Sequence, residues 1–171
     1  MKTIFTLVLL CSLIRFAGSE TGASSPDDMV RGLGKDMKNI EVLEQFVRLI
    51  NLDLNDSNTE KSDRVLKYKF QDGVVAVEIM INDNLTRGLI EIGWWLDAWK
   101  IIQRAFLDYK DVYAVQVSGC FYLTDIYGHK QLSKIAYITM PYLEFKKINR
   151  ENFAARNLPQ IGAGYFKISD E

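Results

Sequence analysis

Two runs of residues that alternate between apolar and polar side chains constrain the fold most. Residues 66–70 alternate in this way, and residues 75–81 continue the alternation after Asp72-Gly73. An Asp-Gly pair between two alternating segments indicates a type I′ turn, because this turn needs positive φ at both central residues. We therefore predict an antiparallel hairpin whose tip is Asp72-Gly73.

The second alternating run spans residues 112–125. A turn around Tyr127-Gly128 connects it to another alternating segment, which ends before Pro141. A glycine inside a strand often marks a β-bulge, so Gly119 is the position where we expect one. This run predicts a second antiparallel hairpin in the same sheet as the first.

Three helices are expected around these hairpins. Apolar residues recur at helical spacing over residues 35–51, a long apolar helix spans residues 85–109, and a last helix runs from about 145 to 158. The element order α-ββ-α-ββ-α predicts an α+β fold, with an antiparallel four- to five-stranded sheet and helices packed mainly on one face. By element order alone this is similar to profilin-like or roadblock-like folds, with a cystatin-like sheet as the alternative. Such a likeness implies a fold and no function.

The first nineteen residues have the composition of a secretory leader. Lys2 precedes an apolar run at residues 4–14, and small residues follow at 17–19. This order is typical of a cleaved signal peptide. The apolar run is about half the ~20 residues that a membrane-spanning helix needs. We therefore expect a secreted or extracytoplasmic protein whose mature chain begins near Glu20 or Ser24 and has no stable membrane span.

The rest of the chain has room for one domain of ordinary size. We predict a signal peptide at 1–19, a linker at 20–36, a single α+β domain at 37–159 and a C-terminal tail at 160–171. A domain of this length can bury a sufficient core without disulfides or a metal.

Composition excludes several classes of function. Cleavage removes Lys2 and Arg15, which leaves 19 basic and 22 acidic residues, a net charge of −3, and no basic stripe for nucleic acid. The mature chain keeps one thiol, Cys120, and one imidazole, His129, which are too few ligands for a usual zinc site. Their separation along the predicted hairpin is too large for a Cys–His dyad. We predict no metal, no cofactor and no catalytic residue.

The central predicted helix has an apolar surface wider than one sheet can cover. Its tryptophans are Trp94, Trp95 and Trp99, and Asp97 belongs to its narrow polar strip. An apolar arc of roughly 240° exceeds the usual stripe of a surface helix. Either the first and last helices flank this helix and bury the excess, or Trp94 and its neighbours form a partner surface, since aromatic residues are enriched in interface cores. A ligand platform is a third interpretation.

One acid and a group of tyrosines complete the candidate sites. Glu91 falls inside the apolar arc, a setting that suits a general acid. The alternative for Glu91 is a helix-start acid that pairs with Arg87. Tyr122 and Tyr127 belong to a tyrosine group around the second hairpin, which either packs on the sheet or forms a binding face.

These features favour a non-catalytic binding or interaction module that uses aromatic surface. The candidate binding residues are Trp94, Trp95, Trp99, Glu91, Tyr122 and Tyr127. The expected partner is an unidentified protein or small ligand, or a second copy in a homo-oligomer. The alternative is a hydrolase-type enzyme that acts on an extracellular or cell-wall substrate with Glu91 as acid/base.

Overall fold

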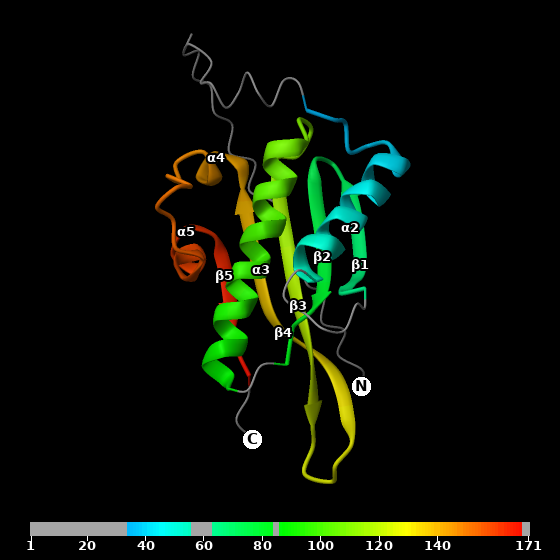
Figure 1. Cartoon of the computed structure of the whole chain (residues 1–171), viewed down its shortest axis with the longest axis vertical. Helices are drawn as coiled ribbons and strands as arrows, with labels where there is room; N and C mark the ends of the chain where they lie inside the picture. The colour runs from blue at the N-terminus through cyan, green and yellow to red at the C-terminus, as the bar shows by residue number, and fades with distance from the viewer. Residues whose placement is uncertain (1–33, 56–62, 84–85, 169–171) are drawn as a thin grey trace, which may run out of the picture.

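A computed structural model describes residues 34–55, 63–83 and 86–168 of the 171-residue chain. The predicted leader, and most of the predicted linker, lie outside these residues. The described part has an α+β fold with four α-helices and one mixed five-stranded sheet, in the strand order β1-β2-β3-β4-β5 (Figure 1).

The first hairpin is confirmed. Strands β1 (Val65–Gln71) and β2 (Val74–Met80) pair antiparallel, and Gln71 lies opposite Val74 at the turn. Asp72 has φ 51° and Gly73 has φ 75°, as a type I′ turn requires.

The second hairpin and its bulge are also confirmed. Strands β3 (Ala114–Thr124) and β4 (Lys130–Pro141) pair antiparallel, with a register shift between Gly119 and Cys120. A Cβ atom at Gly119 would lie 2.5 Å from Cδ1 of Ile81 and 2.8 Å from the ring of Trp94. The position therefore requires glycine because the helix packs directly on the strand there.

The predicted sheet is only partly right, because it is mixed rather than antiparallel. Strands β2 and β3 pair in parallel, with Val74 opposite Ala114 and Met80 opposite Cys120. The reason is helix α3 (Arg87–Asp108). Its 22 residues carry the chain back over about 33 Å to the end of the sheet at which β2 starts. A parallel neighbour needs such a crossover connection, so the two hairpins join through a βαβ unit.

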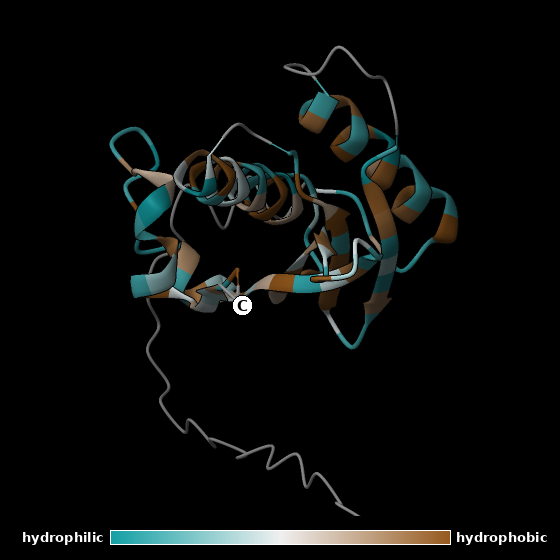
Figure 2. Cartoon of the chain, turned by 90° about the horizontal axis from the view of Figure 1, so that it is seen from below, coloured by the Kyte–Doolittle hydropathy of each residue, from teal (hydrophilic) through white to brown (hydrophobic). Residues whose placement is uncertain are grey.

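Helices α2 (Ile40–Asn55) and α3 lie on the same face of the sheet (Figure 2). Thr86 is the N-cap of α3, and its hydroxyl accepts a hydrogen bond from the backbone N–H of Leu89. The residues of α3 that face the sheet are fully buried; they are Trp94, Ala98, Ile101 and Ala105.

The C-terminal region differs from the single predicted helix. It forms α4 (Tyr142–Phe145), a 3₁₀ turn (Ala155–Asn157), α5 (Leu158–Ile161) and β5 (Ala163–Phe166). The polar stretch after α4 ends the helix, and Asn149 and Asn152 form a turn of the kind that asparagine favours. Residues 163–166, which we expected in a tail, are instead the fifth strand and pair with β4.

Candidate functional site

The second hairpin extends beyond the rest of the sheet. Pairing of β3 with β2 ends at Cys120, and pairing of β4 with β5 ends at Ala136. We call the two-stranded extension, residues 121–134, the β3–β4 arm. It projects past the other strands as the yellow hairpin in Figure 1.

Asp125 organises the tip of the β3–β4 arm. Its Oδ1 accepts hydrogen bonds from the backbone N–H groups of Tyr127 (2.9 Å) and His129 (2.8 Å). Its Oδ2 lies 3.1 Å from Nδ1 of His129, and its carbonyl accepts a bond from Gly128, which has φ 85°. The hydrogen bond from the His129 backbone is the main reason why the pKa of Asp125 is held below its ordinary value. The tip is a closed, hydrogen-bonded turn.

The β3–β4 arm exposes large apolar side chains. Ile126 is 85% exposed and Tyr127 is 79% exposed at the tip. Tyr122 and Leu132 lie opposite each other further along the arm, and both are exposed. Of the predicted binding residues, Tyr122 and Tyr127 therefore lie together on one projecting element.

The three tryptophans are buried in the core. Trp94 packs on the sheet beneath Gly119, and its ring centroid lies 6.0 Å from that of Trp95. Trp99 faces the C-terminal region, with ring centroids 5.8 Å from Phe145 and 4.7 Å from Phe153. Most of the wide apolar arc, including the three tryptophans, is therefore packed, with α2 on one side of α3 and the α4–α5 region on the other. Leu89, Ile92 and Leu96 of the same helix remain about half exposed.

Glu91 lies in an exposed position in the first half of α3. Its carboxylate accepts a hydrogen bond of 3.4 Å from the indole N–H of Trp95. Glu91 lines neither the cleft at α2, nor the cleft at the first hairpin, nor the cleft after α4.

Cys120 and His129 occupy different environments. The Cys120 thiol is buried, and burial, together with the neighbouring Glu78, raises its pKa.

Glu78 forms ion pairs with Lys67 (3.3 Å) and Lys134 (3.1 Å) on the sheet face opposite the helices. Although burial opposes the effect, these two ammonium groups hold the pKa of Glu78 below its ordinary value. Across the described ranges, no cluster of three or more His, Cys, Asp or Glu side chains could hold a metal ion.

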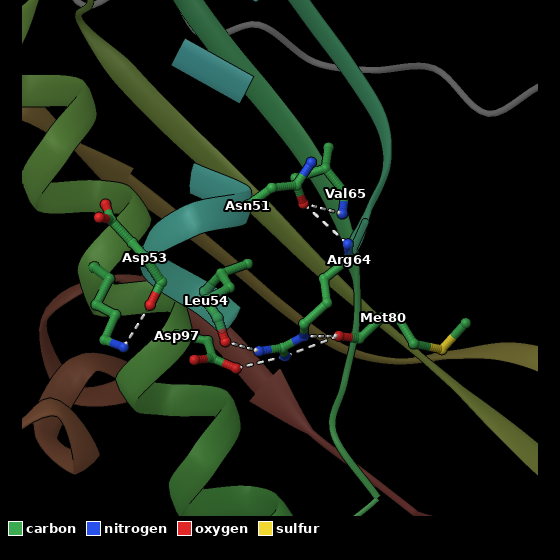
Figure 3. A network of polar contacts seen from close by, with 8 residues as sticks. Asn51, Asp53, Leu54, Arg64, Val65, Met80 and Asp97 are labelled. Atoms are coloured by element: carbon green, nitrogen blue, oxygen red, sulfur yellow. Dashed lines mark hydrogen bonds and ion pairs between the residues drawn. The ribbon is translucent and has the colours of Figure 1, made fainter. Parts of the chain in front are cut away.

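A buried polar network is the feature that sequence reasoning missed (Figure 3). Arg64 is 2% exposed, and its Nη2 donates to Oδ2 of Asp97 at 2.6 Å. The guanidinium also donates to the backbone carbonyls of Leu54 (3.0 Å) and Met80 (2.9 and 3.1 Å). The side-chain oxygen Oδ1 of Asn51 accepts a hydrogen bond of 2.9 Å from the backbone N–H of Arg64. The network thus fixes α2, α3 and the start of the first hairpin relative to one another.

The polar strip of α3 faces α2 rather than solvent. Lys100 donates to the carbonyl of Asp53 at 2.9 Å, and Arg104 donates to both carboxylate oxygens of Asp53 at 2.6 and 3.0 Å. The only signal in the sequence was the presence of Asp97 among apolar neighbours, together with Arg64 directly before a strand.

Comparisons with known proteins give no relative: no family model, no curated protein and no solved structure matches this chain. Within the described ranges, none of the helices has the length and apolar character needed to cross a membrane.

Proposed function

We propose that this protein is a non-catalytic, exported protein-binding module whose β3–β4 arm is its recognition element. The observation that carries the proposal is the exposure of Ile126 and Tyr127, 85% and 79%, on a turn held closed by Asp125. A few side chains near the centre of an interface supply most of its binding energy, and tyrosine is enriched among them.

The geometry of the tip favours binding energetically. Because the hydrogen bonds of Asp125 fix the turn before any partner arrives, less conformational entropy is lost on association. A two-stranded ribbon that extends beyond its sheet is only marginally stable in water by itself. A partner that covers the exposed Tyr122 and Leu132 would stabilise it.

The shape of the β3–β4 arm favours a protein partner over a small ligand. Small-molecule sites are concave and enclose most of the ligand surface. The arm is a projecting element with apolar side chains on its tip and on one face, which fits a hollow in another protein.

Site-specific photocrosslinking tests the proposal. A photoreactive phenylalanine at Tyr127 of the exported protein is expected to give discrete adducts with a partner in the extracellular fraction of its host. Ile126→Ser should abolish these adducts without changing the thermal midpoint, since the side chain is already exposed. Leu143→Ser is the matched control because Leu143 is 72% exposed outside the arm, and this variant should keep the adducts.

Two results would contradict the proposal. One is an adduct pattern at Tyr127 that Ile126→Ser leaves unchanged. The other is an equal yield of adducts when the photoreactive residue replaces Leu143. Sedimentation of the purified mature chain distinguishes a foreign partner from a second copy: if the partner is a second copy, the dimer disappears with Ile126→Ser.

A further inference from the structure

The region after α4 contains a cleft that is separate from the β3–β4 arm. Its volume is about 530 Å³, which lies within the range of small-ligand sites, roughly 300–1,000 Å³. Four side-chain carboxamides line it: Asn149, Asn152, Asn157 and Gln160.

The carboxamides present unused hydrogen-bonding groups. Asn149 already accepts the backbone N–H of Glu151 at 3.3 Å, which holds the loop. Within the described residues, the side chains of Asn152, Asn157 and Gln160 make no hydrogen bond. Each amide offers two N–H donors and one carbonyl acceptor. The cleft can therefore both donate and accept bonds at neighbouring positions.

The cleft has no net charge. Its two charged side chains are Glu144 and Lys147, and Nζ of Lys147 donates to both carboxylate oxygens of Glu144, at 2.7 and 2.9 Å. Because the lysine is paired, an anionic group such as a phosphate finds no free cation among the lining residues. An uncharged ligand avoids the cost of breaking this pair.

One wall of the cleft is apolar and includes an aromatic ring. Phe153 is half-buried between the cleft and Trp99, whose ring centroid lies 4.7 Å away. Ile148 and Ile161 line the same cleft. The buried Trp99 thus supports Phe153 from the core side, and an apolar surface lies beside the amides.

We propose that this amide-lined cleft binds an uncharged saccharide. A pyranose presents hydroxyl groups, each a donor and an acceptor, at its rim and C–H groups on its ring faces. The amides match the hydroxyl groups, and the wall formed by Phe153 and the isoleucines matches the C–H face. The site is independent of the β3–β4 arm and does not rest on the proposed function.

Side-chain NMR tests this site directly. In ¹⁵N-labelled mature protein, the NH₂ signals of Asn152, Asn157 and Gln160 should shift saturably with at least one of three probes, namely maltotriose, cellotriose or chitotriose at millimolar concentration. Gln160→Ala should weaken that binding about tenfold, the loss expected for one or two hydrogen bonds. Gln131→Ala, an exposed amide on the arm, is the matched control and should leave the affinity unchanged.

Asn157→Ala provides a second variant, and the thermal midpoint of both variants shows that they fold. The proposal is overturned if none of the three saccharides shifts these signals. It is equally overturned if triglycine shifts them while the saccharides do not, because the cleft would then recognise peptide. The proposal is also overturned if the saccharide still shifts the remaining amide signals in both Gln160→Ala and Asn157→Ala, because the ligand would then bind elsewhere.

Discussion

Replacing Arg64 by methionine should destabilise the protein by about 3–5 kcal/mol, the usual cost of breaking a buried ion pair by removing one partner. Met fills much of the space of the Arg stem but offers no donor. The substitution leaves the carboxylate of Asp97 and the carbonyls of Leu54 and Met80 without their guanidinium partner. Since domains of this size have about 5–15 kcal/mol of stability in total, the variant loses a large share.

Urea denaturation followed by tryptophan fluorescence measures this loss. Arg48→Met is the matched control, because Arg48 pairs with Glu44 at 4.0 Å with its side chain 80% exposed, and such a pair contributes about 0–1 kcal/mol. The double variant Arg64→Met/Asp97→Leu should recover much of the stability, since a buried pair replaced by apolar residues is often neutral. A loss below about 1 kcal/mol for Arg64→Met, with an unchanged m-value, would refute the reasoning.

The loss of stability caused by Arg64→Met should depend on pH. Burial raises the pKa of Asp97 above its ordinary 3.8, although Arg64 opposes the effect. A carboxyl whose pKa is higher in the folded than in the unfolded state gives stability that falls as pH rises between the two values. Without Arg64, the pKa of Asp97 in the folded state rises further. The pH range over which ionisation of Asp97 lowers the stability therefore becomes wider. The stability difference between wild type and Arg64→Met should therefore shrink as the pH falls.

Other predictions concern packing, reactivity and processing. Gly119→Ala should cost about 1–3 kcal/mol in urea denaturation, since its Cβ would overlap Ile81 and Trp94. Gly88→Ala should instead stabilise by up to about 1 kcal/mol, because the added Cβ meets nothing within 4 Å beyond its chain neighbours and the nearby backbone of its own helix, and alanine favours the helix. The Cys120 thiol, buried and with a raised pKa, should resist iodoacetamide at neutral pH and react fully in urea, as measured by mass. Mass spectrometry of the exported protein should give a mature N-terminus at Glu20 or Ser24; a retained Met1 would contradict the leader.

The hairpins could be predicted because their signals are local. Alternation shows which residues share a face, and Asp72-Gly73 specifies the turn. Alternation does not show which strands become neighbours, so the parallel pairing of β2 and β3 was missed. The 22-residue helix between them carried that information, because a connection of this length fits a crossover better than a hairpin.

The C-terminal strand and the buried ion pair escaped prediction for a different reason. β5 has four residues, one of them Gly164, which is too short for a periodic pattern. Asp97 was assigned to a narrow polar strip without a partner, because a helix in isolation does not reveal a neighbouring helix. Its partner Arg64 is 33 residues away, and the pair becomes buried only when α2, α3 and the first hairpin come together.

The aromatic residues show why surface and core were hard to separate. Of the buried tryptophans on α3, Trp94 packs on the sheet and Trp99 packs on the C-terminal region, so their number indicates the size of the core and not a binding face. The exposure of Tyr122 and Tyr127 follows instead from unequal strand lengths. β3 has 11 residues and β2 has 7, a difference of about 13 Å at ~3.3 Å per residue. Because β5 is shorter still, neither neighbour can cover the end of the second hairpin, and Tyr122 and Tyr127 remain exposed there. Strand length, which the sequence already indicated, therefore places the candidate recognition element more reliably than aromatic content does.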